Sequence, residues 1–287
     1  MQTVHTAAEL KNLVDAARAA KREIVFVPTM GALHAGHLSL VDLAKQGAAE
    51  GHPLVVVSVF VNPLQFGEGE DFDRYPRTLD ADAKLLEGRS ADVLFAPDVD
   101  EVYPNGQEGA NHKVAGPAAK ILEGAARPGH FDGMLTVVAR LFDLVNPDRA
   151  IFGAKDAQQL FLVRQMAAKD YPSLIVQAAP TVRETTGLAM SSRNRYLNAE
   201  QRDIAEILAI ALATVSQLIR EGIPASQALS LGSEMISSEP ETKLDYLALV
   251  DPQTFAVVGD EHSGPALLIV AAYVGGVRLL DNHLFEI

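Results

Sequence analysis

The sequence predicts an α/β protein with a Rossmann-like, doubly wound parallel sheet and a smaller C-terminal α+β domain. Short β-rich runs alternate with helical periodicity over roughly the first 180 residues, which is typical of βαβ units with parallel strands. After about Thr181 the pattern changes to long helical segments followed by grouped strand-like runs, as in α+β domains. The chain has 287 residues and 48% hydrophobic content, enough to bury one large core or two smaller ones.

The first domain is expected to span residues 1–181. Thr6 has capping-box spacing to Glu9, which predicts a helix from there to about Lys21. The elements that follow alternate between strand and helix. Strands are predicted at 23–27, 54–60, 93–96, 150–152 and 174–177, and helices at 38–50, 79–87, 134–145 and 157–169.

The second domain is expected to span residues 182–287 and to act as a lid. It begins with a polar loop at 183–198 and shows no internal repeat. Helices are predicted at 199–221 and 226–237, and strands at 244–250, 267–273 and 277–280.

Composition excludes several classes of function. The absence of cysteine rules out disulfides, thiolate metal sites and a cysteine nucleophile. The net charge of -13 disfavours binding to nucleic acid, although a few convergent cations can still hold a small anion. The longest apolar runs are too short to span a bilayer, and the first residues lack the pattern of a signal peptide. We therefore expect a cytoplasmic protein with no membrane partner.

The first motif lies where the first βα crossover is predicted. It comprises Pro28, Thr29, Met30, Gly31, Ala32, Leu33, His34, Ala35, Gly36 and His37. Ligands of open α/β sheets bind at the carboxyl ends of strands, and a helix N-terminus favours phosphate. Glycines let the backbone approach a phosphate, and two imidazoles three residues apart can both donate to it. The alternative is an ordinary turn with two satisfied histidines.

The second motif lies in the polar loop of the second domain. It comprises Met190, Ser191, Ser192, Arg193, Asn194 and Arg195. Two hydroxyls beside two guanidiniums form an anion-binding set, and a flexible loop can close it over a triphosphate. The alternative is a solvated linker between domains.

Together, the two motifs resemble the paired signatures of the nucleotidyltransferase superfamily, which includes class I aminoacyl-tRNA synthetases and small adenylyltransferases. Met190 and Arg193 stand where the synthetases carry lysines, so the likeness is to a branch of that group. Five segments narrow the likeness further: FVPTMGALHAGH (26–37), VFVNPLQFG (59–67), RPGHFDGM (127–134), FGAKDAQQL (152–160) and GLAMSSRNRYL (187–197). Through them the chain resembles, over nearly its whole length, the pantothenate synthetase (pantoate–β-alanine ligase) family.

The resemblance implies a reaction in two steps. The carboxylate of pantoate attacks the α-phosphorus of ATP and releases pyrophosphate, and the amine of β-alanine then displaces AMP. A carboxylate is already ionised at neutral pH, so the first step needs positioning and charge neutralisation rather than a general base. The family also implies Mg²⁺, which ATP can bring with it, and a homodimer.

The resemblance also implies roles for individual residues. His34 and His37 would contact the phosphates, with His37 as proton donor. Lys155 would reach the phosphates, and Asp156 would hold the ribose. The expected catalytic residues are His34, His37, Lys155 and Arg193. The expected ATP contacts are residues 30–37 (Met30, Gly31, Ala32, Leu33, His34, Ala35, Gly36, His37), Gly153, Ala154, Lys155, Asp156, Val182, Met190, Ser191, Ser192 and Arg193.

The resemblance implies Gln65 and Gln159 as the pantoate contacts. An amide can bind hydroxyls and a carboxylate without adding charge, but outside these motifs the two glutamines would be interpreted as surface residues. Arg127 and His130 fit a structural pair and a catalytic contribution equally well. Asp80 and Asp82 lie where the family has an acidic cluster, but Ala81 interrupts it, and we interpret both as carboxylates on a helix surface. The ligands of Mg²⁺ stay unknown.

Ala154 departs from the family, which usually has glutamate at this position, and we expect modest kinetic effects from it. Three alternative functions remain open at this stage. One is an adenylyltransferase acting on another small carboxylic acid. The others are an ATP-sensing binding module and a tRNA-charging enzyme, the latter disfavoured by the acidic balance.

Overall fold

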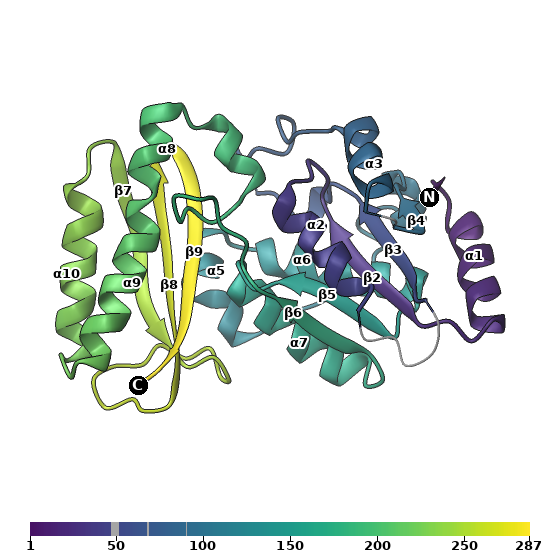
Figure 1. The fold of residues 1–287 in the computed structure, drawn as a ribbon. Coiled ribbons are helices and arrows are strands. Elements are labelled where there is room, and N and C mark those ends of the chain that lie inside the picture. The colour runs from purple at the N-terminus through teal and green to yellow at the C-terminus, as the bar shows by residue number, and fades with distance from the viewer. Residues whose placement is uncertain (47–51, 68, 90) are drawn as a thin grey trace. The chain divides into compact units, whose positions relative to one another are not determined.

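A computed structural model describes residues 1–46, 52–67, 69–89 and 91–287, which fold into two compact units (Figure 1). The N-terminal unit comprises Met1–Gly153 and Leu162–Ala179, and the C-terminal unit comprises Ala154–Phe161 and Pro180–Ile287. Among the described residues, no helix is long and apolar enough to cross a membrane.

The N-terminal unit is built on a six-stranded sheet with the order β1-β4-β3-β2-β5-β6, and every strand pair in it is parallel. From β2 the chain adds β3 and β4 on one side and later β5 and β6 on the other. The strand order therefore reverses between β2 and β5, where ligands of such sheets bind. The strands are β1 (Gln2–Val4), β2 (Ile24–Thr29), β3 (Leu54–Val59), β4 (Val93–Phe95), β5 (Arg149–Gly153) and β6 (Ile175–Ala179).

Helices cover both faces of this sheet (Figure 1). Val25 and Val27 of β2 pack into one cluster with Leu38 and Val41 of α2, whereas the ring of Phe26 between them meets Phe142 of α6 edge-on at 6.3 Å. This alternation follows from the two-residue period of a strand. The helices are α1 (Ala7–Ala19), α2 (Ala35–Ala44), α3 (Leu79–Glu87), α4 (Val99–Val102), α5 (Glu123–Ala126), α6 (His130–Val145) and α7 (Ala157–Asp170), with 3₁₀ turns η1 (Pro63–Gln65) and η2 (Pro117–Lys120).

The parallel sheet confirms the predicted fold class, with differences in detail. The edge strand β1 was not predicted, because three residues are too few to show a period. Two helices begin earlier than expected, α2 at Ala35 instead of residue 38 and α6 at His130 instead of residue 134. The predicted helix at 38–50 ends at Ala44, and its last four residues, 47–50, lie outside the described ones.

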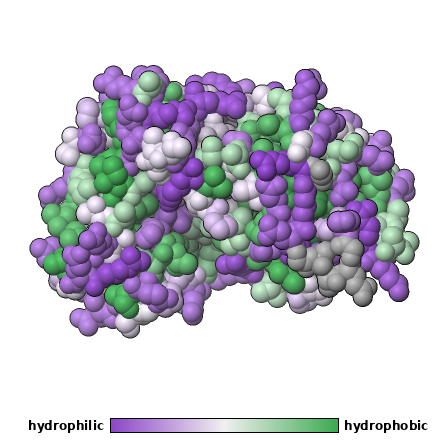
Figure 2. Space-filling model, in the orientation of Figure 1, coloured by the Kyte–Doolittle hydropathy of each residue, from purple (hydrophilic) through white to green (hydrophobic). Residues whose placement is uncertain are grey.

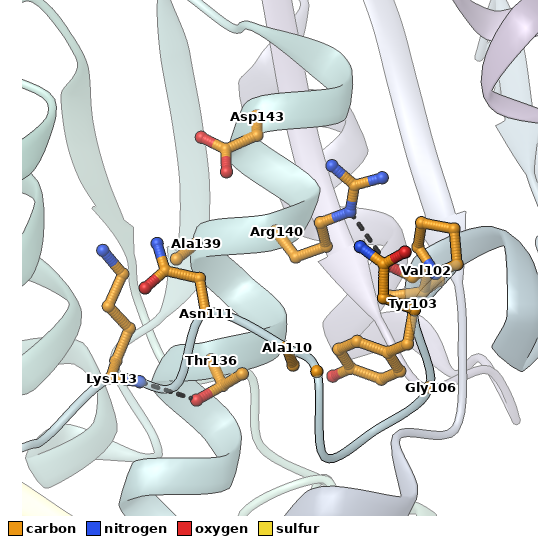
Figure 3. A pocket seen from close by; sticks show the side chains of 13 residues that line it. Val102, Tyr103, Gly106, Ala110, Asn111, Lys113, Thr136, Ala139, Arg140 and Asp143 are labelled. Carbon is orange, nitrogen blue, oxygen red and sulfur yellow. Dashed lines mark hydrogen bonds between the residues drawn. The ribbon is translucent and has the colours of Figure 1, made fainter.

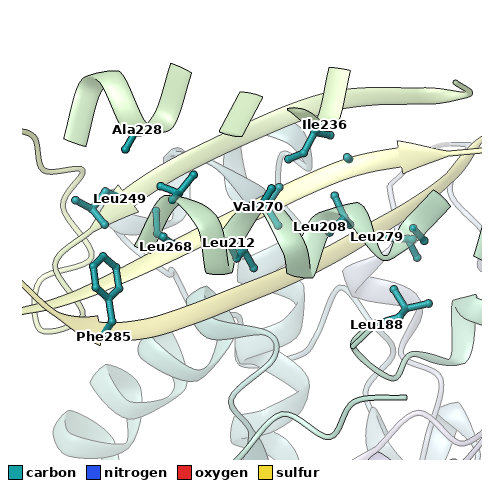
Figure 4. Close-up of a cluster of buried hydrophobic side chains, with 14 of the residues drawn as sticks. Leu188, Leu208, Leu212, Ala228, Ile236, Leu249, Leu268, Val270, Leu279 and Phe285 are labelled. Carbon is teal, nitrogen blue, oxygen red and sulfur yellow. The ribbon is translucent and has the colours of Figure 1, made fainter. Parts of the chain in front are cut away.

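The C-terminal unit packs three helices against a three-stranded antiparallel sheet, with the order β7-β8-β9. Figure 4 shows the apolar cluster of this unit, to which α9 contributes Leu208 and Leu212, α10 contributes Ile236 and β8 contributes Leu268 and Val270. The predicted helix at 199–221 is divided at Glu206, whose backbone N–H bonds Asp203 in a tighter turn. The elements are η3 (Ser192–Tyr196), α8 (Ala199–Ala205), α9 (Ile207–Arg220), α10 (Ala225–Ser238), β7 (Thr242–Val250), β8 (Pro265–Val274) and β9 (Val277–Glu286).

Apolar residues on the face shown in Figure 2 are interspersed with many hydrophilic ones. The exposed large apolar side chains include Ile210 and Leu231, one on α9 and one on α10. Scattered exposure of this kind is normal for protein surfaces and points to no site.

Candidate active site

The turn after β2 has a left-handed backbone at two consecutive residues. Gly31 has φ 80° and Ala32 has φ 51°. A Cβ added to Gly31 would lie 2.9 Å from Val59 Cγ1, so both the conformation and the space favour glycine at this position. Ala32 has a Cβ that disfavours the left-handed conformation, which costs an alanine roughly 1–2 kcal/mol. The surroundings must therefore hold the turn in place.

Asp82 supplies that support. Its carboxylate accepts hydrogen bonds from the backbone N–H of Ala32 (3.0 Å) and of Leu33 (2.8 Å), and from the Thr78 hydroxyl (3.2 Å). Asp82 is 1% exposed, so its interpretation as a helix-surface carboxylate was wrong. Asp80 is exposed on the same helix, as expected. A contact between positions fifty residues apart left no local signal in the sequence.

The two histidines of the first motif lie at the start of α2. His34 is the N-cap, and its Nδ1 accepts the backbone N–H of Gly36 at 3.1 Å. His37 Nδ1 accepts the backbone N–H of His34 at 3.4 Å, and the two ring centroids are 4.1 Å apart. A neutral imidazole that accepts at Nδ1 carries its proton on Nε2. Both rings are therefore oriented as Nε2 donors at a helix N-terminus, where anions are favoured.

Gln65 is buried, with 7% exposure, at the end of η1. Its Oε1 accepts a hydrogen bond from Asn62 Nδ2 (3.3 Å), and its Nε2 faces the Met30 sulfur (2.9 Å). The packing of α6 on η1 is close, because a Cβ on Gly133 would lie 1.9 Å from the Leu64 carbonyl oxygen. Met30 belongs to the first motif, so the structure brings one predicted pantoate contact beside the predicted phosphate-binding turn.

Arg127 and His130 hold the backbone of Gln65. His130 Nδ1 donates to the Gln65 carbonyl oxygen (2.7 Å), and Arg127 Nη2 also points to it (3.4 Å). Arg127 binds Glu70 through Nε (2.7 Å) and Nη2 (2.6 Å), while its Nη1 lies 3.1 Å from His130 Nε2. These protein partners favour the structural alternative for the pair. Asn62 and Glu70 belong to this network and were not predicted.

This network shifts two ionisation equilibria. Burial, followed by the charge of Arg127, lowers the pKa of His130 below its ordinary value. A neutral ring can accept from Arg127 at Nε2, whereas a protonated one could not. Burial alone would raise the pKa of Glu70, but the hydrogen bonds and charge of Arg127 outweigh it and lower that pKa.

Gly153 ends β5, the neighbour of β2, and so lies at the point where the strand order reverses. The next predicted residues, Ala154, Lys155 and Asp156, belong to the C-terminal unit. Asn282 of β9 donates to the carbonyl oxygens of Ala154 (2.9 Å) and Lys155 (2.6 Å). Lys155 Nζ lies 3.7 Å from the Asp156 carboxylate. Asn282 therefore fixes the backbone that presents Lys155, a role that sequence reasoning missed.

The second motif is a structured turn within the C-terminal unit. Met190 N–H donates to the Val182 carbonyl (2.9 Å), and the Ser191 hydroxyl caps η3 by accepting from Arg193 N–H (3.3 Å). The adjoining Arg183 forms paired bonds with Asp281 (2.6 and 2.9 Å). Asp281 directly precedes Asn282, so β9 anchors both the second motif and the Lys155 backbone.

The predicted site residues thus fall into two sets. The N-terminal unit brings together Met30, His34, His37 and Gln65, with Gly153 at the end of the strand beside β2. The C-terminal unit carries Lys155, Asp156, half-buried Gln159, Val182 and the residues of the second motif. Among the residues that the structure describes, no group of three or more acidic or histidine side chains could hold a metal ion.

A cavity of about 220 Å³ lies elsewhere in the N-terminal unit and contains none of the predicted residues. Figure 3 shows Arg140 and Thr136 of α6 on one side of it and the segment from Val102 to Lys113 on the other. Arg140 Nε donates to the Val102 carbonyl at 2.8 Å. The buried Tyr103 lines this cavity and also donates to Asn62 at 2.8 Å, which links it to the Gln65 network.

Comparison with known proteins agrees with the geometry. A sequence model of the pantoate-beta-alanine ligase family matches residues 2–284. A pantothenate synthetase of Nocardioides sp. is 50% identical over 281 residues, covering 97% of this chain and 83% of that one. A pantothenate synthetase of Thermus thermophilus is 48% identical, covering 98% of both chains.

Solved structures show the same fold. The crystal structure of pantothenate synthetase from Thermus thermophilus aligns with a TM-score of 0.89 at 48% identity, over 99% of both chains. Pantoate-beta-alanine ligase from Francisella tularensis, complexed with beta-gamma ATP and beta-alanine, aligns with a TM-score of 0.76 at 32% identity, over 99% of this chain and 97% of that one. These likenesses show that the chain belongs to the pantoate–β-alanine ligase family.

Proposed function

We propose that this enzyme joins pantoate to β-alanine at the expense of ATP, through a pantoyl adenylate, and releases AMP and pyrophosphate. The observation that carries the proposal is the orientation of His34 and His37 at the N-terminus of α2. Both rings accept a backbone N–H at Nδ1, so each has Nε2 as its N–H donor. Family membership selects the acid and the amine. An adenylyltransferase acting on another carboxylic acid is not favoured, since the relatives described above are named pantothenate synthetases.

The first step forms a bond between a pantoate carboxylate oxygen and the α-phosphorus and breaks the bond from that phosphorus to the bridging oxygen. The carboxylate is ionised at neutral pH and needs no base. Negative charge grows on the departing pyrophosphate, and preorganised N–H donors lower the barrier most where charge develops. We assign this role to Nε2 of His34 and of His37, with His37 as the proton donor to the leaving group.

The second step forms an amide bond between the amine nitrogen of β-alanine and the acyl carbon, and AMP leaves with the electron pair of the broken C–O bond. The proposal places Lys155 and Arg193 on phosphate oxygens and Asp156 on the ribose. Ser191, Ser192 and the backbone at Gly153 and Val182 complete the nucleotide contacts. The other residues of 30–37, together with Ala154 and Met190, are assigned to ATP as well.

We assign Gln65 and Gln159 to pantoate. The Gln65 amide is buried and oriented by hydrogen bonds, so it can distinguish hydroxyl and carboxylate groups by donor and acceptor position. A buried amide left without its ligand partner loses a hydrogen bond, which makes such a site selective against acids that lack the matching oxygen.

Mg²⁺ enters the proposal only as a companion of ATP. Among the described residues no group of three or more carboxylates and histidines could hold it, and ATP phosphate oxygens and water would supply most of its ligands. We further propose a homodimer, from the family resemblance, and a cytoplasmic protein without nucleic-acid or membrane partners, from its composition and acidic charge. The domain division at 181/182, with residues 182–287 as a lid, also stays a prediction.

The test is exchange of labelled pyrophosphate into ATP. Exchange should require pantoate and Mg²⁺ but not β-alanine, and adding β-alanine should then yield AMP and pantothenate. Release of ADP, or exchange without an acid, would overturn the proposal. A panel of other small hydroxy acids checks whether the carboxylate substrate has been identified correctly.

His37→Ala should lower kcat by on the order of 10²–10⁴, as expected for a positioned acid or charge stabiliser. His112→Ala is the matched control, because His112 is exposed and outside the predicted site. Equal rates for the two variants would remove His37 from the chemistry.

A further inference from the structure

We propose that Tyr103 is a positioning residue for pantoate, acting through Asn62 on the side-chain amide of Gln65. The inference rests on the proposed assignment of Gln65 to pantoate. Tyr103 directly follows α4 and lies outside the segments that carry the likeness to the family, but it contacts one of them, 59–67, through Asn62 and Phe60.

The contact between Tyr103 and Asn62 is buried. The Tyr103 hydroxyl donates to Asn62 Oδ1 at 2.8 Å, and the two residues are 3% and 1% exposed. The Tyr103 ring packs edge-on against Phe60 at 6.4 Å, which fixes where the hydroxyl points. Burial also raises the pKa of Tyr103, so the hydroxyl keeps its proton and remains a donor.

The Tyr103 hydroxyl and the backbone around Asn62 together orient the Asn62 amide. Asn62 Oδ1 accepts hydrogen bonds from the Tyr103 hydroxyl and, at 3.3 Å, from the backbone N–H of Leu64. A flipped amide would place its NH₂ group against the Leu64 N–H, which cannot accept, and its oxygen against the Gly133 carbonyl, which cannot donate. Asn62 Nδ2 must therefore face the other way, where it donates to the Gly133 carbonyl (3.1 Å) and to Gln65 Oε1 (3.3 Å).

The orientation of Asn62 in turn sets that of Gln65. Because Gln65 Oε1 is held by Asn62, its Nε2 points toward the Met30 sulfur, 2.9 Å away. A thioether is a weak acceptor, so an oxygen of a bound ligand would be the better partner for these N–H groups. The chain from Tyr103 through Asn62 thus presents a donor to the substrate, while His130 holds the Gln65 backbone.

Tyr103 and Arg140 line the cavity in Figure 3, whereas Asn62 and Gln65 are not among the residues that line it. Tyr103 is therefore placed to affect pantoate by orienting its partners and not by touching the substrate. Removal of the Tyr103 hydroxyl oxygen alone therefore tests the proposal.

The test compares Tyr103→Phe with Tyr171→Phe. Both variants keep the ring and remove a hydroxyl in the N-terminal unit. The Tyr171 hydroxyl lies within hydrogen-bonding distance of two acceptors, the Ala139 carbonyl (3.0 Å) and the Asp143 carboxylate (2.9 Å). A hydrogen bond of ordinary net strength corresponds to a factor of about 3–10 in an equilibrium constant. Tyr103→Phe should raise KM for pantoate by that factor and change KM for ATP less than twofold, whereas Tyr171→Phe should change neither.

A double-mutant cycle with Gln65→Ala separates positioning from general destabilisation. If Tyr103 acts through Gln65, Tyr103→Phe should have no further effect on KM for pantoate in the Gln65→Ala background. An unchanged KM in the single variant, or the same change in both backgrounds, overturns the inference. If Gln65→Ala alone leaves KM for pantoate unaltered while exchange continues, the assignment of Gln65 is what fails. Thermal unfolding of each variant shows whether the protein is folded.

Discussion

Replacing Asp82 by alanine should loosen the turn that carries the first motif. Asp82 is the buried acceptor for the backbone N–H groups of Ala32 and Leu33, and Ala32 has a left-handed conformation that needs support. Without the carboxylate, both donors lose their partner inside the protein. The turn that leads directly into His34 would then relax.

The magnitude follows from these contacts. Each buried donor left unsatisfied costs about 1–3 kcal/mol, so the two together give about 2–6 kcal/mol. A loss of about 3 kcal/mol lowers the melting temperature by about 6–12 °C, if each kcal/mol shifts it by roughly 2–4 °C. Small displacements of catalytic groups are costly, and we expect kcat/KM for ATP to fall by about 10- to 100-fold.

The control is Asp80→Ala, which removes the same charge from the same first turn of α3 at an exposed position. Melting temperature and kcat/KM for ATP are measured for both variants. The reasoning is refuted if the Asp82 variant behaves like the Asp80 variant in both measurements. A stable Asp82→Ala protein with unimpaired ATP kinetics would mean that the turn keeps its conformation without the Asp82 carboxylate.

Two further predictions concern pH and the C-terminal unit. Because the pKa of His130 is lowered, folding favours the neutral ring, and this contributes stability above about pH 6.5, the ordinary histidine pKa. The contribution is lost as the pH falls through 6.5 toward the lower pKa of the folded state. The melting temperature should therefore drop more between pH 7 and pH 5 in the native protein than in His130→Gln. Glu70 does not contribute in this window, because its lowered pKa affects stability only below about pH 4.5. Asn282→Ala removes both hydrogen bonds to the backbone of Ala154 and Lys155, and should lower kcat/KM for ATP by about tenfold in the exchange assay. Asn198→Ala, which removes only an exposed helix cap, should leave that ratio unchanged, and equal ratios for the two variants would contradict a role for Asn282.

Local patterns were sufficient for most of the fold. Buried β-rich runs and helical periodicity place every strand of the parallel sheet except β1, and the order of motifs along the chain places the histidine pair after β2. The helix starts were harder to predict. His34 caps α2 with its imidazole, and Gly129 with φ 81° precedes α6, so neither helix begins at a serine, threonine, aspartate or asparagine.

Residue roles that depend on partners distant in sequence could not be predicted from the sequence. Arg127 and His130 fit two interpretations until Glu70 and the Gln65 carbonyl appeared beside them. Asp82 and Asn282 bind backbone groups about 50 and 128 positions away. Every residue has a backbone, so the residue type at the bound position gives no hint of such a contact.

The sequence by itself thus determined the fold class and the family, and it predicted the residues that meet ATP and pantoate, because strand and helix periods and short motifs are local properties of the chain. Only the tertiary structure decided which buried polar groups hold those residues in place. Burial makes an unpaired donor or acceptor costly, and where the partner of each one lies is settled by packing between elements rather than by neighbours in sequence.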